Sequence, residues 1–190
     1  MKTWLVILFS LACISQWYVP ASMIVEQENI LSNGKTFRFK TAPVDPSDPF
    51  RGKYITLSFE ADNYKNTNGH EWERGQKVFV IINEDDKGFA RISDITETLP
   101  DPGKDYVQAE VGFSNDDEMV RVEYPFQRFY LEESKASDAE KVYGEGNRSD
   151  SSQTTYAVVR VKNGRTALED VMINDNSIVD IVRELNEAKD

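Results

Sequence analysis

The stretch from residue 42 to residue 60 limits what this chain can fold into more than any other. It opens with three closely spaced prolines, Pro43, Pro46 and Pro49. Each proline fixes its own φ and pushes the preceding residue toward an extended conformation, so residues 42 to 50 are predicted to form a stiff, non-helical connection. Beyond it, apolar and polar residues alternate from Tyr54 to Glu60, which predicts a half-buried strand.

The polar residues around the prolines have two interpretations. Asp45 and Asp48 are suited to accept backbone N–H groups within the loop. Arg51 can pair with one of these carboxylates, and Gly52 lets the chain turn into the strand. On this first interpretation the side chains only hold the loop in shape. On the second, the locked loop is a docking surface for a partner, because an ordered loop loses little entropy on binding. The candidate docking residues are then Asp45, Asp48, Arg51, Gly52 and Tyr54.

The same stretch carries a family resemblance. Its proline-rich block and the residues Gly52, Tyr54 and Leu57 resemble the GDYXXLXY family of bacterial membrane-anchored proteins, whose function is unknown. Two weaker blocks, at residues 28–39 and 156–168, resemble the same family, so the resemblance covers most of the chain. The naming motif departs at two positions: Lys53 stands in place of Asp, and Phe59 in place of Tyr. Any chemistry that this Asp carries in relatives is therefore absent here.

Composition and charge limit the classes of partner. The chain has 190 residues, 39% of them hydrophobic and 29% charged, which suits one globular domain with an appendage. A net charge of −11 argues against nucleic acid as a partner, because phosphate binding needs clustered Lys and Arg. Cys13 is the only cysteine, so no intrachain disulfide and no thiol zinc site is expected. We predict no cofactor.

An apolar run near the N-terminus indicates a membrane segment. As a helix, residues 4–25 would extend over about 33 Å, enough to cross a hydrocarbon core. Residues 1–27 are therefore predicted to be a membrane anchor or uncleaved signal, and residues 28–190 a separate β domain. Two alternatives remain: the apolar run is a cleaved signal peptide, which would leave a secreted protein, or Cys13 is lipidated.

The charges that flank the apolar run predict its orientation. Lys2 is the only charge before it, whereas Glu26 and Glu28 follow it closely. By the positive-inside rule, the N-terminus is cytoplasmic and the β domain is periplasmic or extracellular. The resemblance implies a bacterial inner membrane, crossed once.

The rest of the chain reads mainly as short strands. Apolar alternation or continuous apolar runs predict strands within residues 36–40, 54–60, 78–82, 89–92, 107–113, 120–124, 156–161 and 167–173. Asn163-Gly164 is a strong hairpin signal, and two short helices are predicted, at 134–142 and from Ser177 onward. The predicted fold is a small β-barrel or sandwich of about eight to ten short strands with two short helices, preceded by the N-terminal hydrophobic helix.

Few residues are candidates for catalysis. His70 is the only histidine, and its polar neighbours predict a surface imidazole without partners. Ser22 lies just beyond the apolar run, like the nucleophile of a signal peptidase, but without the motif of that class. Carboxylates at 84–86 and 116–118 lack the spacing of an EF-hand and are interpreted as solvated turns. A carboxylate pair of the glycosidase type depends on distances that a sequence does not show.

These observations favour a binding protein over an enzyme. The predicted function is that of a membrane-anchored extracytoplasmic β domain that binds another membrane or envelope protein through the 43–54 loop. The alternatives are a hydrolase whose site is assembled only in three dimensions and a secreted ligand-binding module.

Overall fold

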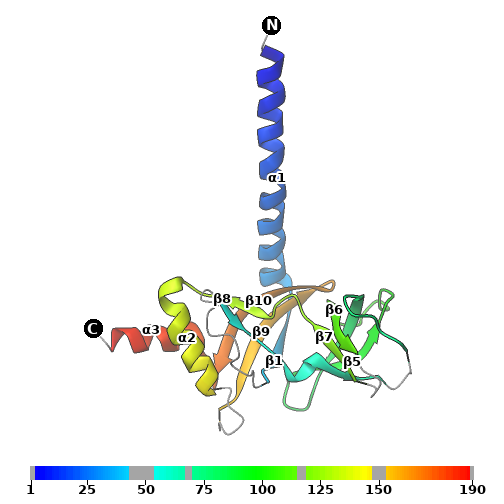
Figure 1. The fold of residues 1–190 in the computed structure, drawn as a ribbon, viewed down its shortest axis with the longest axis vertical. Helices are drawn as coiled ribbons and strands as arrows, with labels where there is room; N and C mark the ends of the chain where they lie inside the picture. Colours follow the sequence, from blue (N-terminus) through cyan, green and yellow to red (C-terminus); the bar gives the residue numbers. More distant parts are fainter. Residues whose placement is uncertain (1–2, 43–53, 67–69, 115–118, 147–152, 189–190) are drawn as a thin grey trace.

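A single long helix stands out from a β-rich body (Figure 1). The structure is a computed structural model that describes residues 3–42, 54–66, 70–114, 119–146 and 153–188. The helix, α1 (Thr3–Asn33), projects away from the body, with the N-terminus at its far end. Its segment Val6–Asn33 is long and apolar enough to cross a membrane, judged by length and composition. Most of its side chains are exposed, so packing against the body does not explain their apolar character.

The body consists of three antiparallel sheets. The first has the order β1-β9-β10-β11, formed by β1 (Lys35–Lys40), β9 (Thr155–Lys162), β10 (Arg165–Ile173) and β11 (Asn176–Ser177). The second has the order β3-β7-β6-β4-β5, formed by β3 (Asn63–Lys65), β7 (Met119–Glu123), β6 (Tyr106–Ser114), β4 (Lys77–Glu84) and β5 (Ala90–Thr96). The third pairs β2 (Tyr54–Thr56) with β8 (Arg128–Tyr130).

This architecture confirms the predicted mainly-β class. The described residues form eleven strands, and eight of them lie within or overlap the predicted segments. The other three, β3, β8 and β11, are only two or three residues long, too short for an alternation of apolar and polar residues to reveal them. Two further helices, α2 (Glu133–Gly146) and α3 (Ile178–Glu187), lie together at one end of the body (Figure 1).

Aromatic rings join the three sheets at the centre. The ring centroid of Phe39, on β1, lies 5.6 Å from that of Phe59, 5.5 Å from that of Tyr124 and 4.9 Å from that of Phe126. All four side chains are buried. Because these residues follow or belong to strands of different sheets, their edge-to-face contacts hold the sheets around one core.

The strand predicted over residues 54–60 is shorter than expected. β2 ends at Thr56, and the chain then turns through a short 3-10 helix, η1 (Glu60–Asp62). The Asp62 carboxylate caps this turn, accepting hydrogen bonds from the Phe59 backbone N–H at 2.8 Å and from the Ser58 hydroxyl at 3.0 Å. The chain stays extended up to Phe59, which forms a bridge with Thr41, but the continuous strand predicted over residues 54–60 ends at Thr56.

The predicted hairpin and terminal helix are confirmed. Asn163 and Gly164 have φ values of 51° and 79° and connect β9 to β10, with Lys162 and Arg165 opposite each other. The hydroxyl of Ser177 accepts a hydrogen bond from the Val179 backbone N–H at 3.2 Å and so caps α3.

We expect Phe39→Ala to lower the free energy of unfolding by about 3 to 5 kcal/mol, because it leaves a cavity in the centre of the aromatic cluster. Phe113→Ala is the matched control, since this ring is 59% exposed and its removal is expected to change the unfolding free energy by less than about 0.5 kcal/mol. Urea unfolding of both variants measures the difference. Equal effects would contradict the central role of Phe39.

Candidate functional site

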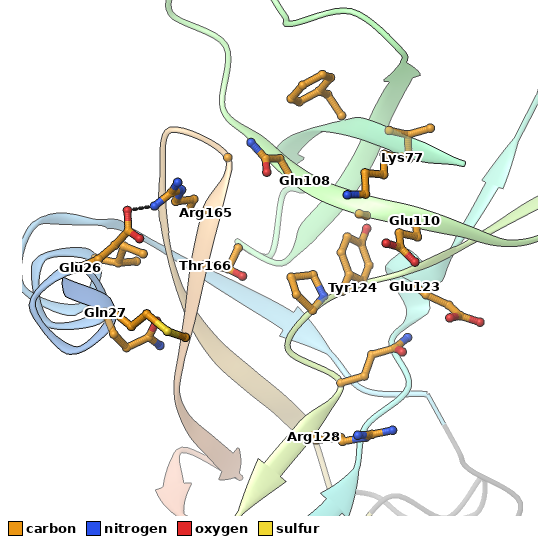
Figure 2. A pocket seen from close by; sticks show the side chains of 18 of the residues that line it. Glu26, Gln27, Lys77, Gln108, Glu110, Glu123, Tyr124, Arg128, Arg165 and Thr166 are labelled. Carbon is orange, nitrogen blue, oxygen red and sulfur yellow. Dashed lines mark ion pairs between the residues drawn. The ribbon is translucent and has the colours of Figure 1, made fainter. Parts of the chain in front are cut away.

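A cleft lies between the end of α1 and the strands of all three sheets. It encloses about 950 Å³, and we call it the helix-side groove. Side chains that line it include Met23, Glu26, Gln27 and Ile30 of α1, Lys77 of β4, Gln108 and Glu110 of β6, Glu123 of β7, Arg128 and Tyr130 of β8, and Arg165 and Thr166 of β10 (Figure 2).

The wall formed by α1 is fixed to the β9–β10 hairpin. Glu26 forms an ion pair with Arg165, drawn as a dashed line in Figure 2. Three residues further along the helix, the Asn29 side-chain oxygen accepts a hydrogen bond from Lys162 Nζ at 2.8 Å. The side chain of Ile30 is buried. These contacts fix the last turns of α1 relative to the sheet.

Only Gly34 separates α1 from β1. Its N–H donates to the Ile30 carbonyl at 2.7 Å, which ends the helix. A Cβ atom at this position would lie only 2.5 Å from that carbonyl oxygen and 3.0 Å from Cβ of Arg160, so a larger residue would force the helix and the sheet apart. The junction therefore contains no linker in which the helix and the body can move independently.

A row of charged side chains crosses the strands on the other side of the groove. Lys77 lies opposite Glu110 in the pairing of β4 with β6, and Glu110 lies opposite Glu123 in the pairing of β6 with β7. All three side chains are exposed and none forms an ion pair within the described part of the chain. Because like charges directly opposite each other are unfavourable, this row attracts positive charge.

Tyr54 is the one predicted docking residue within the described ranges. Its ring centroid lies 5.5 Å from that of Tyr130, and the Arg128 guanidinium carbon lies 5.1 Å from the Tyr54 ring centroid. Since Arg128 and Tyr130 line the helix-side groove, Tyr54 adjoins it. The other predicted docking residues, Asp45, Asp48, Arg51 and Gly52, lie outside the described residues.

Among the described carboxylates outside this groove, Asp62 has the most strongly shifted pKa. Asp62 is 1% exposed, and burial raises the pKa of its carboxyl to about 6. The two hydrogen bonds that the carboxylate accepts and the charge of Arg121, 4.0 Å away, act in the opposite direction and lower this pKa. The neighbouring Tyr124 hydroxyl donates to the Ala61 carbonyl at 2.8 Å, and burial raises the pKa of this phenol well above its usual value. Asp62 lines neither of the two clefts described here, so its arrangement indicates a structural role.

His70 lies at the surface, as predicted, but it has partners, which corrects the expectation of an imidazole without them. It lies in a second cleft of about 380 Å³, with Nε2 2.9 Å from a carboxylate oxygen of Glu97. The same oxygen accepts a hydrogen bond from the Gln76 amide at 2.7 Å, and the imidazole contacts the Trp72 ring at a centroid distance of 4.4 Å. The described residues that line this cleft include no serine or cysteine, and its hydroxyl groups belong to Thr96, Thr98 and Tyr64.

Two other predicted candidates have local partners. The Ser22 hydroxyl donates to the Val19 carbonyl at 2.7 Å on the exposed surface of α1, and no bond from it to a lysine occurs within the described ranges. Asp85 accepts hydrogen bonds from the backbone N–H groups of Lys87 and Phe89 at 2.9 and 2.8 Å. These bonds, the Phe89 bond first, lower the pKa of Asp85 and make it the cap of its own turn.

Comparisons with known proteins identify one family. The family model described as "GDYXXLXY protein" matches residues 16–171, from the second half of α1 to Val171 of β10. No curated protein and no solved structure matches the chain.

We expect Asp62→Asn to remove part of the pH dependence of stability. The folded protein binds the Asp62 proton more tightly than the unfolded chain, so the wild type loses stability as pH rises from about 4 to about 6, by about 3 kcal/mol. Asn keeps an acceptor for the Phe59 N–H and carries no charge. Urea unfolding between pH 4 and 7.5 should show the variant gaining on the wild type through this interval, then a constant difference. Parallel curves would contradict a buried carboxylate with a raised pKa.

Proposed function

Because this chain belongs to the GDYXXLXY family, we propose that it is a membrane-anchored docking protein of the bacterial envelope. Residues 1–27 anchor it in the inner membrane, and residues 28–190 form an extracytoplasmic β domain. Lys2 before the apolar run and Glu26 and Glu28 after it favour a cytoplasmic N-terminus. The β domain binds another membrane or envelope protein at the helix-side groove.

The strongest support is the fixed position of the groove beside α1. Glu26 and Ile30 line the groove and also hold the helix against the body. These residues directly follow the apolar run, so a helix inserted through residues 4–25 places the groove at the membrane surface. A surface held there meets the extracytoplasmic segments of other membrane proteins, which diffuse in the same plane.

The chemistry of the groove favours binding over hydrolysis. The described residues that line it include no serine, cysteine or histidine. They include exposed charges of both signs and the exposed ring of Tyr130, which suit recognition of a polypeptide. The 43–54 loop ends at Tyr54, directly beside Tyr130, so we propose that Asp45, Asp48, Arg51 and Gly52 extend the same docking surface.

The proposed orientation is testable with one introduced cysteine. In a Cys13→Ser background, Leu99→Cys places a thiol at an exposed position of the body, where the leucine is 67% exposed. We expect a membrane-impermeant maleimide to label it in intact spheroplasts, and the protein to stay in the membrane fraction at alkaline pH. Labelling only after lysis would contradict an extracytoplasmic domain, and release at alkaline pH would contradict an anchor.

Docking is testable with a photoreactive amino acid in the full chain. We expect p-benzoylphenylalanine at Tyr130 or Tyr54 to cross-link a discrete envelope protein in native membranes. The same residue at Phe113 is the matched control, because Tyr130 is 65% and Phe113 59% exposed, and Phe113 does not line the groove. Equal adducts at Tyr130 and Phe113, or adducts to lipid alone, would contradict docking at the groove.

A further inference from the structure

Among the residues that the structure describes, β8 is paired along one edge only, with β2. In its antiparallel pairing with β2, Phe129 lies opposite Ile55, and the Leu57 N–H donates to the Gln127 carbonyl at 2.8 Å. Backbone groups of successive residues in a strand point to opposite sides, and those of Gln127 and Phe129 point toward β2. The N–H and C=O groups of Arg128 and Tyr130 therefore point away from β2.

β10 also has an unpaired edge. The two-residue turn that joins it to β9 makes Arg165 and Lys162 the closing hydrogen-bonded pair, so the backbone groups of Thr166 and Leu168 point away from β9. On this outer side β11 pairs only with Met172 and Ile173. The first half of β10 thus has no strand on its outer edge within the described part of the chain.

Residues of both edges line the helix-side groove. They are Arg128 and Thr166, labelled in Figure 2, and Tyr130, and no described residue hydrogen-bonds to their outward N–H and C=O groups. An unpaired strand edge is a template for an added strand, because its donors and acceptors are already spaced for one. We propose that the partner binds as an extended polypeptide segment that adds a β-strand to the outer edge of β8, an inference that rests on the proposed docking function.

The charges of the groove define the chemistry of the segment. Arg165 is neutralised by Glu26, and the Arg128 guanidinium lies over the Tyr54 ring. Glu110 and Glu123 lie opposite each other, and Lys77 lies opposite Glu110 on its other side. The strand that fits therefore carries a lysine or arginine whose side chain reaches these two carboxylates.

The space between the edges limits how the segment pairs. β8 and β10 approach each other to within 8 Å, measured between Cα atoms. A strand hydrogen-bonded to both would need about twice the interstrand spacing of roughly 4.8 Å. The added strand thus pairs with β8 along its length and meets β10 only near Thr166, where the groove is open.

A defined peptide tests this mode of binding on the full chain in lipid nanodiscs. The probe is a seven-residue peptide of alternating valine and threonine with one central lysine. We expect NMR to show slowed amide exchange at Arg128 and Tyr130 when it binds. Two further peptides carry N-methyl groups on alternate residues, one on the odd positions and one on the even positions. The peptide whose methyl groups replace the N–H groups that face β8 should bind at least about tenfold more weakly, because two or more hydrogen bonds are lost. Replacing the lysine by glutamate should weaken binding as well.

Variants of the protein distinguish the contribution of the Arg128 backbone to peptide binding from that of its side chain. Arg128→Pro removes the outward N–H, whereas Arg128→Ala removes only the side chain, so we expect weaker peptide binding for Pro than for Ala. Phe113→Ala alters an exposed residue that does not line the groove and is expected to bind like the wild type. If Arg128→Pro does not fold, the two methylated peptides still decide the question.

The outcomes distinguish this inference from the docking function itself. If Tyr130 cross-links an envelope protein in membranes but binding tolerates N-methylation in both registers, strand addition is wrong and docking stands. If Tyr130 gives no protein adduct, docking is wrong. Concentration-dependent dimers cross-linked through Tyr130→Cys would show that a second copy occupies the groove, which overturns the proposed occupant.

Discussion

The contact of Phe39 with the three other buried rings is the interaction on which the remaining structure depends. Phe39 comes from β1, which directly follows α1, whereas Phe59 follows β2, and Tyr124 and Phe126 lie between β7 and β8. The cluster therefore holds together three sheets that share few hydrogen bonds with one another. It also fixes the end of β1, the strand that directly follows the helix.

Two buried polar groups, the Tyr124 hydroxyl and the Asp62 carboxylate, lie beside this apolar centre. The buried Tyr124 hydroxyl and the Asp62 carboxylate both bind the turn that follows Phe59. Burying the carboxylate costs free energy, as its raised pKa indicates, but the same side chain caps the 3-10 helix η1, which leads directly into β3. The turn and the core thus depend on one unfavourable burial that is offset by two hydrogen bonds.

Much of the fold was predictable from local patterns, whereas the groove was not. Alternating apolar residues, the Asn163-Gly164 turn and the Ser177 cap act within a few residues, so the sequence reveals them. The helix-side groove combines segments from α1 to β10 and has no local motif. The same limit applies to Glu97, which lies 27 residues from His70 along the chain. Opposite charges at Glu26 and Arg165 were visible, but nothing in the sequence alone indicated that they meet.

The residues of the naming motif have different structural roles in this chain. Leu57 and Phe59 are buried in the core, while Tyr54 packs at the surface against Tyr130. Phe59 lies at a fully buried position among aromatic rings. A phenylalanine has no hydroxyl that needs a buried partner, so it suits this apolar site.

The single-glycine junction after α1 determines how the body can move. A domain on a flexible tether samples many orientations, but here helix and sheet turn as one rigid body. For a chain anchored as proposed, rotation of the helix about its own axis sweeps the groove around that axis by the same angle. Access is then directional: an approaching segment in the plane of the bilayer reaches the groove from one side of the helix only.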